Sequence, residues 1–377
     1  MQLADLPTPQ VLIDRTRALN NIARVQDLAS SAGLRLRPHA KTHKSPVVAK
    51  WQIDRGAVGI CCAKLGEAEV FAAAGITDIR LPYPVNPINA PRMLALMQRA
   101  TMSIIVDHLA VARGWSETMV RAGQRLDVLI KVDVGFHRCG IDPNGDALEF
   151  VKAVSAMPGL RLRGLLSHAG HGYHAASEAE LASIAREEVA ILTTLQSAAS
   201  AAGITLDELS VGATPTLRYS AREKGITELR PGNYVYFDRT QLALGAATLD
   251  DCALTVMATV VSKPAADRII LDCGSKTLTN DQARGITAAS GYGAVLAGER
   301  DELDYARELD DSLTIERLSE EHATVRVTGG TRLEPGDRVR VLPNHSCTVS
   351  NLVDVVRLVV GDEVIETIPV AARGRIQ

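Results

Sequence analysis

The sequence predicts an α/β protein in which a parallel (β/α)8 barrel is followed by a C-terminal antiparallel β domain. From residue 10 to about 245, short β-rich runs alternate with alanine-rich stretches of helical period, as in repeated βα units. After about residue 245 the helical period nearly disappears and β-rich runs dominate. The 377 residues also exceed what one hydrophobic core usually serves. We therefore expect a barrel over residues 8–245 and a β domain over residues 246–377, with residues 1–7 packing against the second.

Eight short runs are the expected barrel strands. They cover residues 34–37, 58–62, 78–81, 102–106, 128–132, 160–168, 208–211 and 234–237. Stretches of helical period separate them at residues 19–31, 65–74, 90–99, 109–122, 146–156 and 178–202. Several of these helices end before a glycine, which favours the left-handed turn at a helix C-terminus: Gly33, Gly75, Gly123 and Gly203. Eight strands over this length favour a barrel, and an open doubly wound sheet is the alternative.

The expected β domain contains β-rich runs separated by Gly-Asp turns. The runs cover residues 254–261, 268–272, 322–327, 338–342 and 355–360, with turns at residues 336–337 and 361–362. Two domains of different texture create a cleft at their junction, where small-molecule sites commonly form.

The overall composition indicates an ordinary soluble globular protein rather than a nucleic-acid or membrane protein. Hydrophobic residues make up 46% of the chain, charged residues 23%, and the formal net charge is −3. We expect no nucleic-acid partner. The first residues lack a basic segment followed by an apolar core, and no apolar run of about 18 residues occurs, so we expect cytoplasmic residence without a membrane anchor. The six cysteines have no paired CxxC spacing, and we expect most to be reduced packing residues.

Lys41 is a candidate for covalent chemistry because it follows the first expected strand. Leu34 and Leu36 alternate with arginines, and Pro38 then interrupts any helix. A lysine at the carboxyl end of a barrel strand lies where such enzymes keep their catalytic groups. From these residues alone, a solvated Lys/His-rich loop is an equal alternative.

Further polar residues follow other expected strands and would face the same end of the barrel. They are His39, Arg138, His168, His171, Tyr173, Thr214 and Gly232. The segment 211–216, with Gly212, Ala213 and Thr214, offers backbone N–H groups to an anion, and Arg230, Gly232 and Asn233 would close a second side. A phosphate cradle near a strand-end lysine favours pyridoxal phosphate, whose aldehyde forms an imine with a lysine amine.

The C-terminal motif Asn344-His345-Ser346-Cys347 is a candidate metal site. On an extended run, His345 and Cys347 point to the same face, and imidazole with thiolate is a suitable pair of ligands for zinc. Two protein ligands leave coordination positions open for water or substrate. Packing residues are the alternative interpretation from these residues alone.

The motifs together resemble one family, the fold-type III pyridoxal-phosphate enzymes, and within it the D-threonine aldolase and D-serine dehydratase group. The similar segments are residues 8–9, 38–41, 131–140, 167–171, 211–216, 230–234 and 343–347. The resemblance implies an alanine-racemase-like barrel and a homodimer. It also implies that Lys41 binds the cofactor, Arg138 lies near its phenolic oxygen and His168 packs on its ring. Arg230 would face the pyridine nitrogen, with Tyr173 as the alternative.

The same resemblance implies a divalent metal at His345 and Cys347, either zinc or manganese, with magnesium as a further candidate. Members of the group carry metal ligands here, as His-x-Asp in aldolases and His-x-Cys in dehydratases. The metal would lower the pKa of a substrate hydroxyl. The expected substrate is therefore a 3-hydroxy-D-amino acid.

Two lyase reactions fit these parts. An aldolase would remove the hydroxyl proton, with water or His171 as base, and give glycine and an aldehyde. A dehydratase for D-serine or 3-hydroxy-D-aspartate would remove the Cα proton with Lys41 and give a keto acid and ammonia. Residues 348–354 and 371–374 resemble the aldolases and place D-threonine aldolase first. A metal-free racemase and a non-catalytic cofactor-binding protein are more distant alternatives, against which the His-x-Cys motif and the second domain argue.

Overall fold

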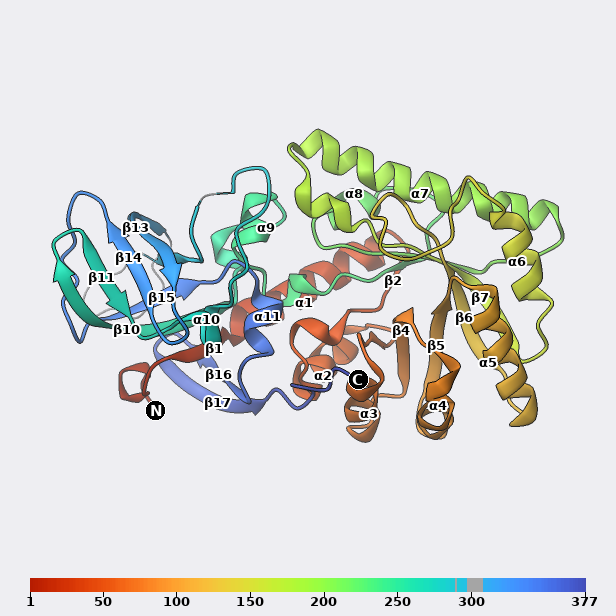
Figure 1. The fold of residues 1–377 in the computed structure, drawn as a ribbon, viewed down its shortest axis with the longest axis horizontal. Helices are drawn as coiled ribbons and strands as arrows, with labels where there is room; N and C mark the ends of the chain where they lie inside the picture. Colours follow the sequence, from red (N-terminus) through yellow and green to blue (C-terminus); the bar gives the residue numbers. More distant parts are fainter. Residues whose placement is uncertain (289, 297–307) are drawn as a thin grey trace.

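The computed structural model describes residues 1–288, 290–296 and 308–377, which form one eight-stranded and one nine-stranded sheet (Figure 1). The eight-stranded sheet is parallel throughout, in the order β2-β9-β8-β7-β6-β5-β4-β3. A bridge between His39 and Cys61 joins its two edges, β2 and β3. The predicted (β/α)8 fold class is therefore confirmed.

The barrel strands are short at the seam and longer on the opposite side. They are β2 (Arg35–Leu36), β3 (Ile60–Cys61), β4 (Asp78–Pro84), β5 (Thr101–Val106), β6 (Leu126–Lys131), β7 (Leu160–Leu166), β8 (Glu208–Val211) and β9 (Glu228–Leu229). The eighth strand differs from the predicted run at residues 234–237, where the chain instead forms a 3-10 turn, η5 (Asn233–Val235). The aromatic residues Tyr234 and Tyr236 gave that run its strand-like composition, but they are fully buried packing residues.

Helices cover the outside of the barrel, and short helices also follow strands of the nine-stranded sheet. The α-helices are α1 (Arg15–Ser31), α2 (Pro46–Arg55), α3 (Leu65–Ala73), α4 (Ala90–Met97), α5 (Leu109–Arg121), α6 (Ala147–Ser155), α7 (Glu178–Ala201), α8 (Leu217–Ser220), α9 (Arg239–Ala243), α10 (Ser275–Leu278) and α11 (Ser346–Ser350). The other 3-10 turns are η1 (Leu3–Asp5), η2 (Ala40–Thr42), η3 (Pro87–Asn89), η4 (Gly170–His174) and η6 (Leu249–Asp251). The sequence prediction omitted α2, which begins at a proline and ends at Gly56, whose φ is 122°.

The nine-stranded sheet contains a closed portion and an extension. Its order is β11-β14-β13-β12-β15-β10-β1-β16-β17, and β10 also pairs with β11, which closes six strands into a second barrel. The strands are β1 (Gln10–Asp14), β10 (Leu254–Ala265), β11 (Arg268–Leu271), β12 (Ala294–Leu296), β13 (Leu309–Leu318), β14 (Ala323–Val327), β15 (Arg338–Leu342), β16 (Val355–Val360) and β17 (Glu363–Pro369). All pairings are antiparallel except β1 with β16.

More of the N-terminal segment belongs to the nine-stranded sheet than we expected. Strand β1 pairs with β10 and β16 and thus carries residues 10–14 into this sheet, whereas the prediction assigned only residues 1–7 to it. The boundary at residues 245 and 246 stays a prediction.

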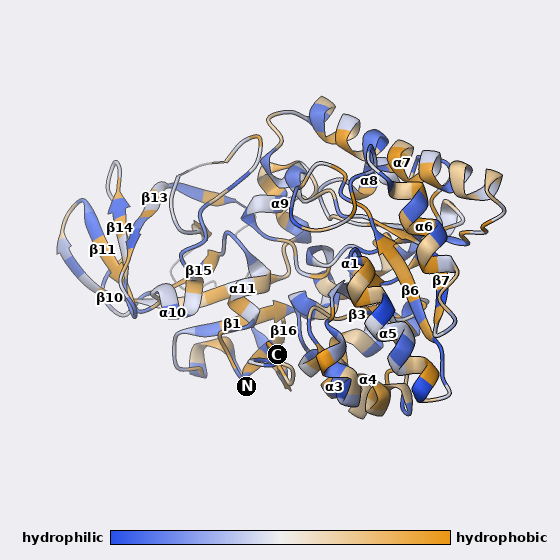
Figure 2. Cartoon of the chain, turned by 45° about the vertical axis from the view of Figure 1, so that its right-hand side comes forward, coloured by the Kyte–Doolittle hydropathy of each residue, from blue (hydrophilic) through white to orange (hydrophobic). Residues whose placement is uncertain are grey.

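The inside of the parallel barrel is apolar along the strands and ionic at their amino ends. Strand β6 is mostly hydrophobic along its length, as expected for a strand covered on both faces (Figure 2). Near the amino ends of the strands, Glu228 lies 2.9 Å from Arg37, and Arg80 pairs with both Glu228 and Glu208. These groups are 5% exposed or less, so the amino end of the barrel is a buried ionic layer. None of the helices within the described ranges is long and apolar enough to cross a membrane.

Candidate active site

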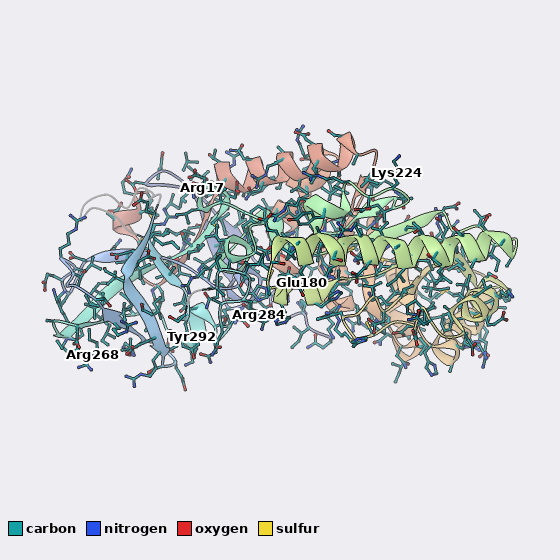
Figure 3. All side chains as sticks on the ribbon, turned by 90° about the horizontal axis from the view of Figure 1, so that it is seen from above. Arg17, Glu180, Lys224, Arg268, Arg284 and Tyr292 are labelled. Carbon is teal, nitrogen blue, oxygen red and sulfur yellow. The ribbon has the colours of Figure 1, made fainter. Side chains whose placement is uncertain are left out.

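A cavity of about 210 Å³ opens at the carboxyl ends of the barrel strands, many times the roughly 15 Å³ that one water molecule needs. It is lined by His39, Lys41, Pro82, Lys131, Phe136, Arg138, Leu166, His168, Gly170, Tyr173, His174, Gly212, Ala213, Thr214, Arg230, Gly232, Asn233, Arg284, His345 and Cys347. Both sheets contribute, because the last three residues follow β11 or β15. Figure 3 shows Arg284 at the junction between the β domain and the barrel.

The structure brings together every sequence-predicted site residue except His171. The ring of His171 lies against Gly135, and its buried Nδ1 has no hydrogen-bond partner within the described chain. His174, from the same turn η4, lines the cavity instead. The assignment of His171 as the base therefore finds no support in the geometry.

Lys41 differs from the neighbouring Lys44 in what it contacts. It lies on η2, the first element after β2, where the ring nitrogen Nδ1 of His39 accepts a hydrogen bond from its backbone N–H at 3.3 Å. Lys44 is buried, lies 3.1 Å from Glu67 and donates to Asn351 at 2.7 Å. Of these two lysines, only Lys41 lines the cavity.

Two close approaches shape the proposed phosphate cradle. A Cβ atom on Gly212 would lie 2.8 Å from the backbone of Arg230, and one on Gly232 would lie 3.1 Å from His39. Only glycine fits at Gly212 without a shift of the backbone. Thr214 Oγ1 is buried and has no hydrogen-bond partner in the part of the chain that the structure describes. This open hydrogen-bonding group beside glycine backbone fits a phosphate.

Arg230 is held from one side by the barrel. Its Nε donates to Ser210 Oγ at 2.6 Å, and its Nη2 donates to the carbonyls of Ser167 and Ser210. Ser210 Oγ in turn donates to Glu228 at 2.6 Å, which connects Arg230 with the ionic layer. Nη1 takes part in none of these contacts, and the guanidinium lines the cavity.

His168, Phe136 and Arg138 form a stacked group on the cavity wall. His168 Nδ1 lies 2.5 Å from the carbonyl of Gly212 and donates to it, so Nε2 is the free acceptor. The ring of Phe136 meets His168 edge-on at 5.7 Å, and the Arg138 guanidinium lies 5.0 Å from the Phe136 ring. Burial, followed by the charge of Lys41, holds the pKa of His168 well below its usual range, so its imidazole is neutral.

The sequence prediction missed several lining residues, among them Lys131, the last residue of β6. The position of Lys131 at a strand end is the signal that identified Lys41, and it was available in the sequence. Burial, followed by the Arg230 cation, lowers the pKa of Lys131 to about 8. Arg284 had no such signal, because it lies on a turn of the β domain without regular structure.

His345 and Cys347 do not lie on an extended run as predicted. Only His345 is extended, with φ −145° and ψ 101°, and Cys347 lies in the first turn of α11. Both side chains still line the cavity, and the Cys347 thiol lies 3.2 Å from Thr42 Oγ1 beside Lys41. Burial alone would raise the pKa of the Cys347 thiol, but His345 and then Lys41 lower it.

The donor set at this position suits a metal with open coordination positions. Imidazole and a thiol of lowered pKa are ligands of borderline softness. Within the described ranges no cluster of three or more His, Cys, Asp or Glu residues surrounds them. The remaining ligands of a bound ion would therefore come from water or substrate.

Comparison with known proteins gives two family matches and long relatives. Residues 13–240 match the alanine racemase N-terminal domain, and residues 253–359 match a putative serine dehydratase domain. A D-threonine aldolase from Arthrobacter sp. is 34% identical, covering 99% of this chain and 94% of that protein. A D-threo-3-hydroxyaspartate dehydratase from Delftia sp. is also 34% identical, covering 92% of each chain.

The solved structure of that dehydratase has a TM-score of 0.90 and 32% identity, covering 98% of each chain. A cysteine-to-alanine variant of it was solved in the metal-free form and has a TM-score of 0.91.

Proposed function

The chain belongs to the fold-type III pyridoxal-phosphate enzymes, in the group of D-threonine aldolase and D-serine dehydratase, and we propose that it is a lyase acting on 3-hydroxy-D-amino acids with a divalent metal. Family membership confirms the resemblance seen in the sequence. One observation carries the proposal: Lys41 of the barrel and His345 with Cys347 of the β domain line one cavity.

The residues present fit pyridoxal phosphate. Lys41 would bind it covalently, the open Thr214 Oγ1 and the backbone at Gly212 and Gly232 would hold the phosphate, and His168 would pack on the ring. When bound, this cofactor accepts the electron pair released at the substrate's Cα. Arg230, held by Ser210 and Ser167, keeps one edge of its guanidinium toward the cavity and would face the ring nitrogen.

The residues also fit a metal ion at His345 and Cys347, for which we propose zinc or manganese. A bound metal lowers the pKa of a coordinated hydroxyl. Because the two ligands lie beside Lys41, a substrate held at Lys41 would bring its β-hydroxyl to them. Arg138, which lies over the Phe136 ring and is expected near the cofactor's phenolic oxygen, would also offer positive charge to the substrate's α-carboxylate.

Our first candidate reaction is the aldolase reaction of D-threonine. Here the chain must take up the proton of the β-hydroxyl, and the Cα–Cβ bond breaks to give glycine and acetaldehyde. His174 lines the cavity where the prediction placed His171, and we propose His174, acting directly or through water, as that acceptor. The C-terminal segments 348–354 and 371–374, which resemble aldolases, support this order.

Dehydration of 3-hydroxy-D-aspartate is the second candidate, and two observations favour it. Cys347 matches the His-x-Cys pattern of the dehydratases, and Lys41 can take the proton from Cα. Arg284 adds a cation from the β domain to the lysines and arginines that line the cavity from the barrel, and among the described residues it has no acidic partner. With Arg230 assigned to the ring nitrogen and Arg138 to the α-carboxylate, a carboxylate at Cβ would pair with Arg284.

Product analysis separates the candidates. From D-threonine, an aldolase gives acetaldehyde and glycine, whereas a dehydratase gives 2-oxobutanoate and ammonia. From D-threo-3-hydroxyaspartate, the corresponding products are glyoxylate with glycine, or oxaloacetate with ammonia. All four threonine stereoisomers belong in the assay. Turnover restricted to the two D-isomers is the expected result, and comparable turnover of L-threonine would overturn the proposal in favour of a racemase.

A homodimer completes the proposal, as the family resemblance implies. Light scattering after gel filtration measures the assembly directly. A mass near twice the 40.3 kDa of one chain is expected. A monomer at micromolar concentration would remove this part of the proposal.

A further inference from the structure

Asp281 lies outside the barrel, on the turn that follows α10, and contacts the imidazole of the metal-ligand candidate His345. The preceding Thr279 has a φ of 66°, which lies in the left-handed region that residues with a side chain rarely adopt. Such a conformation persists where surrounding contacts hold it. This turn forms hydrogen bonds with Thr348 of α11 and with Asn344, the residue before His345.

The Asp281 carboxylate is the centre of these contacts. Its Oδ2 accepts hydrogen bonds from Thr348 Oγ1 at 2.7 Å and from Thr279 Oγ1 at 3.2 Å. The backbone carbonyl of Asp281 accepts from Asn344 Nδ2 at 2.9 Å. Asn344 and Thr348 flank His345 and Cys347, and we call residues 344–348 the ligand loop. These hydrogen bonds therefore fix the turn and the ligand loop to one another.

The same oxygen faces one particular nitrogen of His345. Asp281 Oδ2 lies 3.4 Å from His345 Nδ1. With Nδ1 directed to the carboxylate, Nε2 is the nitrogen left for a metal in the cavity shared with Cys347. A histidine that ligates a metal usually donates its other ring N–H to such a carboxylate, which fixes the tautomer and the ring orientation.

We propose that Asp281 is the positioning residue of the metal site, holding His345 with Nε2 toward the ion. This inference rests on the metal part of the proposed function. It goes beyond it by assigning a residue that contacts neither cofactor nor substrate. Asn344 and Thr348, which are distant from Asp281 in sequence, hold it within reach of the His345 imidazole.

A barrel residue holds the other side of the ligand loop. Asp238 Oδ2 accepts from the backbone N–H of Ser346 at 2.9 Å and from Asn233 Nδ2 at 2.5 Å. Asp238 thus fixes the backbone between the two ligands, whereas Asp281 contacts the imidazole itself. Only the second contact affects which imidazole nitrogen is free, so metal affinity is the property that distinguishes the role of Asp281.

The test measures metal affinity rather than activity. The cofactor-loaded, metal-stripped protein is titrated with Zn²⁺ and with Mn²⁺ against a chelator of known affinity. We expect Asp281→Ala to weaken binding about 10- to 100-fold, the usual cost of losing an outer-shell partner, while the cofactor absorbance stays unchanged. Asp281→Asn keeps an acceptor oxygen but loses the charge, and we expect a smaller loss.

Asp272→Ala is the matched control. Asp272 is a partly buried carboxylate of the same domain that accepts from Thr8 and from the backbone of Thr259, with no contact to the ligand loop. It should leave metal affinity unchanged. Thr348→Val, which removes one support of Asp281 without touching the imidazole contact, should weaken binding less than Asp281→Ala.

The outcomes separate this inference from the proposed function. Metal binding of wild-type strength in both Asp281 variants overturns it, and so does a fall in the melting temperature of the metal-free protein with unchanged affinity, which would mark a purely structural tie. Absence of metal binding in the wild-type protein, measured first, would instead refute the metal site itself. If Asp281→Ala fails to fold, Asp281→Asn supplies the measurement.

Discussion

The barrel and the β domain supply the two halves of one cavity in different ways. On the barrel side, the lining residues lie at the ends of parallel strands or on the loops that follow them, and a layer of buried ion pairs lies beneath them. On the β-domain side, Arg284, His345 and Cys347 stand on turns whose position depends on contacts with distant residues such as Asp238 and Asp281. We therefore expect cofactor binding to survive changes in the β domain and metal binding to be the more easily disturbed of the two.

The largest expected effect is on the barrel side. Lys41→Ala should lower turnover by at least about 10²- to 10⁴-fold, the usual contribution of a positioned acid–base group, and should remove covalent attachment of the cofactor. Borohydride reduction of the wild-type protein followed by peptide mapping should place the pyridoxyl group on Lys41. A pyridoxyl group on Lys44, Lys64 or Lys276 would contradict the assignment.

On the β-domain side, His345→Ala and Cys347→Ala should each lower turnover on the order of 10³-fold, because a bound metal contributes several kcal/mol to charge stabilisation. The cofactor absorbance should stay nearly intact, since the barrel binds the cofactor. Turnover and absorbance measured on the same sample check both statements. Loss of the absorbance in either variant would contradict the expectation that the barrel binds the cofactor independently of the metal ligands.

The ionic layer beneath the site predicts a stability effect. Burial alone would raise the pKa of Glu228, but Arg80 and Arg37 lower it to about 2, from a usual value of 4.5. A carboxylate with a lowered folded pKa stabilises the protein above its unfolded value and loses this contribution as the pH falls through the folded value. The wild-type protein should therefore lose stability between about pH 4.5 and 2.

Glu228→Ala tests this layer directly. Removing one partner of a buried ion pair costs about 3–5 kcal/mol, and Arg37 and Arg80 would both lose an acceptor. Denaturant melts at pH 7 measure the loss, and melts at low pH should show a weaker pH dependence than the wild type. A pH profile identical to that of the wild type would refute the role of Glu228. Glu366→Ala, an exposed change on β17 of the β domain, is the control.

The smallest expected effect concerns substrate choice. Arg284→Gln should lower kcat/KM for D-threo-3-hydroxyaspartate roughly tenfold, which corresponds to the free energy of one hydrogen bond to a charged group. The kcat/KM for D-threonine should stay almost unchanged. The ratio of the two values is the informative quantity. An equal fall for both substrates would place Arg284 at the α-carboxylate instead.

The sequence predicted the barrel side of the molecule well because most lining groups follow a strand of strong β pattern. The sequence did not predict β9, which consists of Glu228 and Leu229. A glutamate that pairs with an arginine inside the barrel cannot be told from an exposed glutamate by its sequence alone. The run at residues 234–237 was preferred for its aromatic residues. Strands β1, β12, β13 and β17 were missed for similar reasons of short or polar sequence.

The site followed the same division. Lys41, Arg138, His168 and Arg230 were found from strand ends and motifs, and the structure brings them together. His171 and His174 are separated by three positions on one turn, and sequence alone does not tell which of them faces the cavity. Asp281 and Arg284 carry no local signal, because only long-range contacts bring them to His345 and to the cavity.

The central claim is that the two halves serve one reaction, and metal removal tests it most directly. D-Threonine turnover and cofactor absorbance are followed together before exhaustive chelation, after it, and after adding back Zn²⁺ or Mn²⁺. We expect turnover to disappear on chelation and to return with the metal, while the absorbance of the barrel-bound cofactor remains throughout. Full turnover in a protein that elemental analysis shows to be metal-free would contradict it.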